Sequence, residues 1–349
     1  MLALTILSAS YALMTPQTMG ITPDAAFPID GEPLVLNYGD LRPGQPFDEA
    51  IVSWNVKSPS AAQVTIEARG RAGADPTKWY RMAEWSIARN GRRQSTDGQK
   101  DADGDVLTDT LRFTKPQNGL DLRVTLRRLD QSSDPVLDLV TVSFSRGKAA
   151  VNDQATPSPA WGRMLTIPER AQGNYPRGNV LCSPTSVSML MKHYSTILKQ
   201  PDLDRDVPEV EAAVYDPVYK GAGNWPFNTA FVGSFPGMRA YVSRFGSIRD
   251  LERWIEAGLP VICSVSFDLV RGRPLSPSES GHLVVLIGFE KDGDPIFNDP
   301  ARKDQVRYVY KRADFERGWV YSHRTVYLIH PINAKVPTGS HGRWLEMSQ

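Results

Sequence analysis

The sequence predicts an α+β protein in which an all-β domain precedes a domain of mixed helices and strands. Before residue 147, short runs of alternating apolar and polar residues recur with Gly, Asp and Pro clusters between them, and no long helical pattern intervenes. After residue 160, two helical patterns are followed mainly by strand-like runs. The first pattern favours a β-sandwich-like packing, and the second favours an α+β domain over a doubly wound sheet.

The stretch between these two patterns is small, polar and proline-bearing, which predicts a linker. A chain of 349 residues is long enough for two domains with separate cores. The predicted organisation is an apolar N-terminus at residues 1–20, a β-sandwich-like domain at 21–146, the linker at 147–160, the mixed domain at 161–332 and a C-terminal tail at 333–349.

Charge and the N-terminal segment limit the expected partners and location. Lys+Arg 40 against Asp+Glu 39 leaves a formal net charge of +1, so the chain has no positive excess to attract a nucleic acid. The run "MLALTILSASYALM" has the length of a signal-peptide apolar core but lacks a basic start, and it is shorter than the roughly 20 residues that span a bilayer. We expect a secreted or extracytoplasmic protein with no permanent membrane span; a disordered or docked N-terminus is the alternative.

Strand-like runs fill the predicted β-sandwich-like domain: "AIVSWNV", "QVTIEA", "WYRMAEWS", "LDLRVTLRR" and "VLDLVTVSFS". Trp54, Trp79 and Trp85 stand in these strands, where tryptophans more often fill a core than form a sugar-stacking platform. A surface or glycan ligand for this domain is the alternative. The acidic run at residues 97–109 lacks the Asp and Glu that an EF-hand needs at its first and last positions, and it predicts a solvated hairpin turn.

Two helices are expected in the mixed domain, followed mainly by strands. "SPTSVSMLMKHY" spaces Val187, Leu190, Met191 and Tyr194 to share one face. "SIRDLERWIEAG" combines an N-cap serine, an apolar stripe and a terminal glycine. The expected strands are "PVICSVSF", "GHLVVLIGF", "DPIFN", "VRYVY" and "TVYLIH".

Cys182 stands at the start of the first predicted helix, where free backbone N–H groups and the helix dipole lower the pKa of a thiol. Cys263 lies inside an apolar run and is expected in the core. If the chain is exported, the two cysteines could form a disulfide, which only their spatial arrangement can exclude. Cys182 is therefore a candidate nucleophile, with a buried hydrophobe and half of a disulfide as the alternatives.

A nucleophilic cysteine needs a general base. His282 is the candidate, because it follows a glycine at the mouth of the apolar strand "GHLVVLIGF" and can be held in place while open to a cleft. A histidine that merely caps the strand is the alternative. The other histidines are His193 within the first helix, His323 and His330 beside the last strand, and His341 in the polar tail.

Asp299 is the candidate to orient that imidazole, 17 positions after His282. A hairpin turn centred on residues 290–291 sets Asp299 directly opposite His282. A turn at 292–293, the better turn pair, sets it opposite Leu286, about 13 Å away along the strand. Both registers put Asp299 on the same face as His282, and Asn298 on the other face. The sequence therefore predicts the face and leaves the register open.

A tetrahedral oxyanion also needs donors, of which the backbone N–H of Cys182 is one. Gln172 is the glutamine shortly before the cysteine and is the candidate for the second donor. Asn179 is the competing side chain, and an exposed loop position is the alternative reading of Gln172.

The stretches "IPERAQ", "LCSPTSVSMLM", "GAGNWPFNTAFVGSFPGMRAYVSRF" and "GHLVVLIGFEKDGDPIFNDP" resemble the bacterial cysteine peptidase-like domains related to the double-glycine bacteriocin-processing peptidases, the C39-like peptidase domain of the papain-like superfamily. The resemblance covers residues 161–332. The preceding β-rich domain resembles the one found before this peptidase domain in secreted bacterial proteins. The resemblance implies Cys182 as nucleophile, His282 as base, Asp299 as orienting acid and Gln172 as oxyanion donor.

The function that this resemblance implies is a papain-like cysteine peptidase that hydrolyses a peptide or protein substrate through a covalent acyl-enzyme. A non-peptidase amide hydrolase or acyl transferase with the same residues, and a catalytically silent binding module, are the alternatives. No cofactor or metal is expected, because the two cysteines and the scattered histidines lack ligand spacing. The chain shows no 20-residue apolar spans like those of transporter-fused members, so the double-glycine specificity is not expected to carry over.

Overall fold

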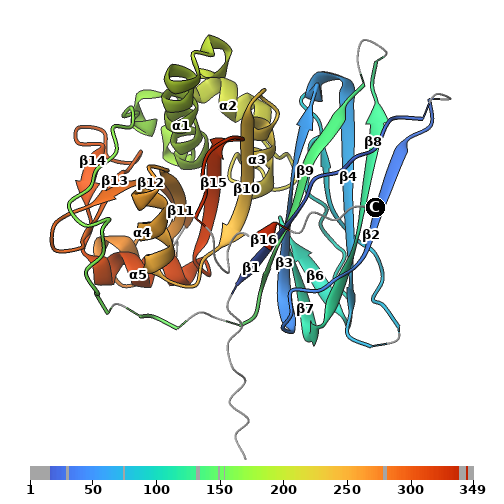
Figure 1. Ribbon diagram of the computed structural model, residues 1–349, viewed down its shortest axis with the longest axis horizontal. Helices are drawn as coiled ribbons and strands as arrows, with labels where there is room; N and C mark the ends of the chain where they lie inside the picture. Colours follow the sequence, from blue (N-terminus) through green and yellow to red (C-terminus); the bar gives the residue numbers. More distant parts are fainter. Residues whose placement is uncertain are drawn as a thin grey trace, which may run out of the picture.

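The computed structural model describes residues 16–28, 31–73, 75–130, 134–147, 150–152, 154–277, 281–337 and 343–344. Mixed helices and sheets follow a β-rich N-terminal region, as the sequence predicts (Figure 1). We call residues 16–147 the β-rich part and residues 154–337 the mixed part. Most of the apolar run predicted as a signal segment lies outside the described residues.

Two sheets make up the β-rich part, with strand orders β16-β1-β9-β3-β7-β6 and β2-β8-β4-β5. The strands of the first are β1 (Gln17–Ile21), β3 (Phe47–Lys57), β6 (Gly104–Leu107), β7 (Thr110–Gln117), β9 (Val136–Ser145) and β16 (Arg343–Trp344). Those of the second are β2 (Leu34–Leu41), β4 (Ala62–Arg71), β5 (Tyr80–Trp85) and β8 (Gly119–Arg128). All their pairings are antiparallel except β1 with β16, which is parallel.

Alternating side chains explain how these sheets pack, because every second residue of β4 and β8 is buried between them. Trp54 on β3 meets Trp85 on β5 edge to face, with ring centroids 6.3 Å apart. Both are buried, so the core prediction for these two is confirmed. Trp79 instead lies under the guanidinium groups of Arg69 and Arg123. The three tryptophans therefore form no common platform.

Two strands lie at the predicted boundaries, and a hairpin turn lies within the acidic run. β1 pairs with β9 from Gln17 onward, so the predicted start of the β-rich domain at residue 21 falls inside a strand. Residues 343–344, expected in a tail, pair with β1. The β6–β7 hairpin turns at Thr108 and Asp109, since Leu107 pairs with Thr110. Thr108 takes the left-handed backbone conformation there, with φ of 60°.

The mixed part is built around one antiparallel sheet with the order β10-β15-β11-β12-β13-β14. Its strands are β10 (Met238–Arg244), β11 (Val261–Ser266), β12 (Gly281–Phe289), β13 (Pro295–Asn298), β14 (Arg307–Val309) and β15 (Thr325–Pro331). The helices are α1 (Cys182–Leu198), α2 (Val207–Val214), α3 (Trp225–Gly233), α4 (Ile248–Glu256) and α5 (Arg312–Tyr321). The two predicted helices are confirmed as α1 and α4, and α4 has the predicted serine N-cap in a capping box.

Helices cover both faces of this sheet (Figure 1). On β12, Leu283 and Val285 face the core that contains α1 and α3, whereas Val284 and Leu286 face the core that contains α4 and α5. Strands buried on both faces read as continuous apolar runs, which is how "GHLVVLIGF" appears in the sequence.

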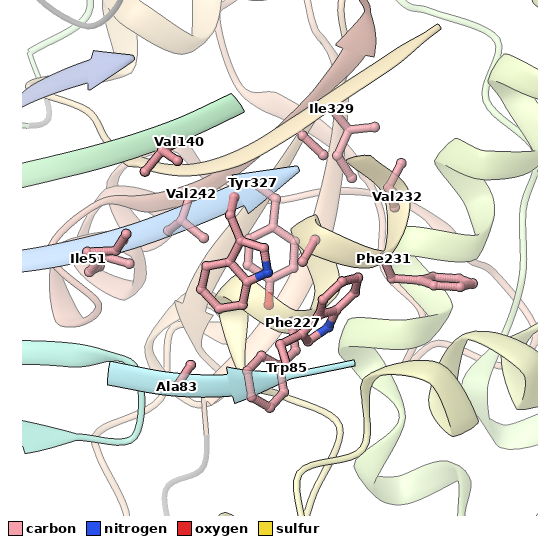
Figure 2. Packing of buried hydrophobic residues seen from close by; sticks show 14 of the residues in the cluster. Ile51, Ala83, Trp85, Val140, Phe227, Phe231, Val232, Val242, Tyr327 and Ile329 are labelled. Carbon is pink, nitrogen blue, oxygen red and sulfur yellow. The ribbon is translucent and has the colours of Figure 1, made fainter. Parts of the chain in front are cut away.

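The core on the α1 and α3 side continues into the β-rich part. Figure 2 shows Ile51, Trp85 and Val140 beside Phe227 and Tyr327 of the mixed part, and all belong to one cluster of buried side chains. The expectation of two separate cores is therefore wrong. The physical reason is that the first sheet buries its second face too, against β10 and α3, instead of exposing it to water.

Buried polar contacts fix this junction. Asn55 on β3 donates to the carbonyl of Ala240 (2.7 Å) and accepts from its N–H (3.1 Å). Gly233 lies against the same asparagine, and a Cβ there would come within 2.1 Å of its Nδ2. At the β6–β7 turn, Asp109 accepts from the backbone N–H of Trp225, the first residue of α3 (3.0 Å). Burial raises the pKa of Asp109 to about 6.

Candidate active site

Helix α1 begins at Cys182, and side chains of its first two turns hold that end in place. The Ser183 hydroxyl bonds to the Tyr327 hydroxyl on β15 (3.0 Å), and the Ser186 hydroxyl donates to the Leu283 carbonyl on β12 (3.1 Å). Cys182 is itself partly exposed. The helix start therefore presents the thiol beside the first residues of β12, where His282 stands.

The Cys182 thiol and the His282 imidazole interact through their side chains and shift each other's pKa. Burial alone would raise the pKa of the Cys182 thiol, but the bond with His282, the imidazole charge and backbone contacts from Ser183 and Leu283 bring that pKa below its ordinary value. Burial alone would lower the pKa of His282, but Asp299 and then Cys182 raise it. Both shifts favour a thiolate beside an imidazolium.

Asp299 is the second partner of the His282 ring. Its Oδ1 lies 2.6 Å from Nε2 of His282, which leaves Nδ1 to face the thiol. Asp299 is fully buried, and burial alone would raise its pKa; the imidazole, the Tyr310 hydroxyl and the Ala301 N–H hold that pKa well below its usual range. A buried carboxylate at this distance fixes both the orientation and the tautomer of the imidazole.

The register between β12 and β13 matches neither of the two predicted hairpins. Val285 pairs with Asn298 and Leu286 with Phe297, and a β-bulge at Ile287 shifts the pairing beyond it. Continued by one residue, this register sets Asp299 opposite Val284, so Asp299 is diagonal to His282 on the same face, within reach of a histidine. The prediction that the two share a face is confirmed, and both predicted registers are wrong.

The bulge lies where residues 161–165 pack against β12. These residues pair with the end of β12, beyond the point where its pairing with β11 ends. The Leu165 N–H donates to Ile287, and the Phe289 N–H donates to Arg163. Gly288 is pressed against this segment, because a Cβ there would lie 2.2 Å from the Arg163 carbonyl oxygen. The strand therefore bends at a glycine that has no room for a side chain.

Gln172 and Asn179, the two candidate oxyanion donors, lie in different environments. Gln172 is buried, its N–H donates to the Pro300 carbonyl (2.9 Å), and its Oε1 has no partner among the described residues. Asn179 is exposed. Gly178 packs directly on the Gln172 carbonyl, where a Cβ would come within 2.2 Å, so the long connection to Cys182 folds back on itself. This folding brings Gln172 toward the start of α1 despite the long spacing.

Cys263 and the other described histidines are not part of this arrangement. Cys263 is buried on β11, burial raises its pKa well above the ordinary value, and neither cysteine forms a disulfide. His193 is half-buried along α1, and burial lowers its pKa. His323 lies against Glu49 at the junction with the β-rich part, and His330 is buried against Trp254. His341 lies outside the described residues.

Three residues that the sequence reasoning missed surround Asp299. The Tyr310 hydroxyl donates to its Oδ2 (2.5 Å), and a guanidinium nitrogen of Arg271 and another of Arg302 each lie 3.5 Å from the same oxygen. Tyr310 follows β14, the partner of β13, so the only sequence signal was a tyrosine in the strand-like run after "IFNDP". The two arginines come from loops and carry no pattern.

Among the described residues, no group of three or more His, Cys, Asp or Glu side chains is arranged to hold a metal ion. In the same part of the chain, no helix is both long and apolar enough to cross a membrane.

A thiol at a helix start beside an imidazole that is held by a buried carboxylate is typical of thiol hydrolases. The family comparisons agree with that class. Residues 164–327 match the model of the Peptidase_C39 like family, and residues 39–145 match the model of the Peptidase C39 N-terminal domain. The resemblance inferred from the sequence is therefore confirmed. The exact domain boundaries stay a prediction.

Comparison with curated protein sequences gives no significant match. Among solved structures, the chain is similar to a crystal structure described as a C39-like peptidase from Bacillus anthracis, with 18% sequence identity. That match covers 49% of this chain and 94% of the other, and its TM-score is 0.36.

Proposed function

We propose that this chain is a cysteine peptidase that hydrolyses peptide bonds with Cys182, His282, Asp299 and Gln172. The observation that carries the proposal is the placement of His282, which is 2.6 Å from the buried Asp299, beside the helix start at Cys182, whose pKa the imidazole lowers. All three residues lie in the segment that matches the C39-like family model. Thiol hydrolysis needs a nucleophile, a base and a group that orients the base, and these three residues supply them.

In the first step, the Cys182 thiolate attacks the carbonyl carbon of the peptide. A C–S bond forms, and the carbonyl π electrons move to the oxygen. The Cys182 backbone N–H and the Gln172 side-chain amide donate hydrogen bonds to that oxyanion. Gln172 is buried, and its backbone N–H donates to the Pro300 carbonyl in the loop that follows Asp299, whereas Asn179 is exposed. This placement supports Gln172 over Asn179 for the role.

In the second step, the oxyanion electrons return, the C–N bond breaks, and the His282 imidazolium gives its proton to the departing amine. Water then attacks the thioester while neutral His282 takes a proton from it. The C–S bond breaks, the carboxylic acid product leaves, and the thiolate and imidazolium are restored. Asp299 keeps its negative charge throughout and stabilises each imidazolium state.

Two further features belong to the proposal. The packing of α1 against the antiparallel sheet that carries His282 supports a papain-like arrangement. The apolar run at residues 1–14 supports action outside the cytoplasm of a bacterium, on a peptide or protein substrate. A surface or glycan ligand for the β-rich part stays a prediction.

The test is cleavage of a mixed peptide library by the purified full-length chain in a reducing buffer, followed by mass spectrometry. Wild type should cleave, Cys182→Ala should lose cleavage, and Cys263→Ala should retain it, because the buried Cys263 is the matched control. Equal loss in both variants, or full activity of Cys182→Ala, would overturn the assignment.

The alternatives appear as distinct outcomes of the same experiment. Products in which a peptide is joined to an added amine, without free acid, would indicate acyl transfer through the same residues. A chain that cleaves no library member yet alkylates at Cys182 would favour another amide substrate. A chain that does neither would be a binding module.

A further inference from the structure

A basic cavity is lined by residues that contact Oδ2 of Asp299, the carboxylate oxygen that is not bonded to His282. Its volume is about 580 Å³, within the range of small-molecule sites. Four of its lining side chains are basic: Arg271, Arg273, Arg302 and Lys311. Asp314 is the acidic side chain of the lining, and it is already paired with Arg317. Lys311 is likewise paired, with Asp294 at 2.8 Å. Within the described residues, the three arginines therefore leave the cavity with a surplus of positive charge.

Two of these arginines share one carboxylate. Arg271 and Arg302 each approach Oδ2 of Asp299 at only 3.5 Å, the outer limit of a hydrogen bond. Asp299 is also hydrogen-bonded to His282 and Tyr310, at the much shorter distances of 2.6 Å and 2.5 Å. One negative charge therefore faces two guanidinium groups and an imidazolium.

Ring stacking holds both guanidinium groups beside the cavity. Arg271 lies over Phe267, 3.7 Å from the ring centre, and Arg302 lies over Tyr308 at 3.2 Å. The buried Nε of Arg271 has no partner among the described residues. Arg273 is exposed at the cavity and forms no ion pair with any described side chain. Hydrogen-bond donors in this cavity outnumber the carboxylates that could receive them.

We propose that this cavity binds a phosphate group and that the bound anion strengthens the pairing of His282 with Cys182. Guanidinium forks match the oxygens of phosphate, and arginine is suited to such recognition because its geometry is rigid. The anion offsets the charge of Arg271 and Arg302, which otherwise repels the imidazolium. The bound anion is nearer to His282 than to Cys182, because Asp299 and His282 lie between the cavity and the thiol. It therefore stabilises the imidazolium more than it destabilises the thiolate, and the charged pair is favoured.

Binding is tested without any turnover, by isothermal titration of inorganic phosphate into full-length Cys182→Ala at fixed ionic strength, with sodium chloride as the comparison. Saturable binding of phosphate and none of chloride is expected. Adding Arg273→Gln should weaken binding about tenfold, the effect of one hydrogen bond to a charged group. Arg253→Gln, an exposed arginine on α4 outside the cavity, should leave binding unchanged.

Glycerol phosphate is the second probe, and it separates free phosphate from a phosphate ester as the source. Tighter binding of the ester assigns the rest of the cavity to an organic group, and weaker binding assigns the site to the free ion; either order supports a phosphate site. Absence of saturable binding by both probes, or equal affinity in Arg273→Gln and its parent, would overturn the proposal.

The effect on Cys182 is measured by its rate of alkylation with iodoacetamide in a Cys263→Ala chain. At a pH where the thiol is only partly ionised, saturating phosphate should raise the rate severalfold, and Arg273→Gln should need about ten times more phosphate for the same increase. Equal rates with and without phosphate would overturn the coupling. Neither measurement depends on peptide cleavage, so a failure of the proposed peptidase function leaves both results readable.

Discussion

Replacement of Asp299 by asparagine tests how far the buried carboxylate controls Cys182. Asparagine keeps the size and one acceptor oxygen but removes the charge that lies 2.6 Å from His282 Nε2. Asp299 has no solvent exposure, so water cannot take over the role of the carboxylate. The variant should therefore lose the imidazolium and, with it, much of the thiolate at neutral pH.

The size of the effect follows from the charge pair. Unit charges about 4 Å apart attract by about 4 kcal/mol at an effective dielectric constant near 20. Because about 1.4 kcal/mol is a factor of ten, the thiolate population can fall by up to about 10³-fold. Arg271 and Arg302 remain beside the new amide and oppose the imidazolium further, so the loss should be near this limit.

The assay is the rate of iodoacetamide alkylation at Cys182 between pH 4 and 10, read by peptide mass spectrometry. Wild type should alkylate at a pH below the ordinary pKa of a thiol, because the pKa of Cys182 is lowered, and Cys263 should stay unmodified in the fold. Asp299→Asn should alkylate only as the pH rises well above neutral. Asp304→Asn, on the exposed loop after β13, is the matched control. An identical pH profile for wild type and Asp299→Asn would refute the role of the carboxylate.

Three further predictions concern stability. Gly288→Ala should lower the free energy of unfolding, measured with urea, by about 3 kcal/mol, because its Cβ would overlap the Arg163 carbonyl. Gly281→Ala on the same strand is the control: its Cβ meets no atom within 4 Å, so the free energy of unfolding should not change. Asp109→Asn should stabilise the chain above pH 6 by at most about 3 kcal/mol. The pKa of Asp109 is about 6 in the folded chain against an ordinary value of about 3.8, so wild type loses stability as the pH rises from 4 to 6. A difference in thermal midpoint that stays constant over that range would contradict this. Asn55→Ala should cost about 2–4 kcal/mol, because it leaves two buried backbone groups of β10 unpaired; a cost below 1 kcal/mol would show that water or other groups replace them.

Local chemistry explains what the sequence could predict. The helix start at Cys182, the glycine before His282 and the strand end at Asp299 are short-range signals, and period-two alternation places His282 and Asp299 on one face in every register considered. The register itself depends on the bulge beside Gly288, which is caused by a segment more than 120 residues away in the chain. No local pattern encodes such a contact.

The same limit applies to the junction and to the surroundings of Asp299. Asn55 reads as one polar residue in a strand, and only the placement of β10 against it makes it a bridge between the two parts. Arg271 and Tyr310 gain a role because loops and strands converge on Asp299. Alternation and turn chemistry predict which residues face inward, but the partner on the other side is a property of the whole fold.

The shared core has a consequence for how the chain can be divided. A fragment that contains only residues 161–332 would leave the cluster around Phe227 and Tyr327 open to water, because Ile51 and Trp85 of the β-rich part cover it. Such an uncovered apolar face promotes aggregation. We therefore expect that a cut at residues 147–160 gives two halves that aggregate, because each exposes apolar side chains that the other half buries in the intact chain.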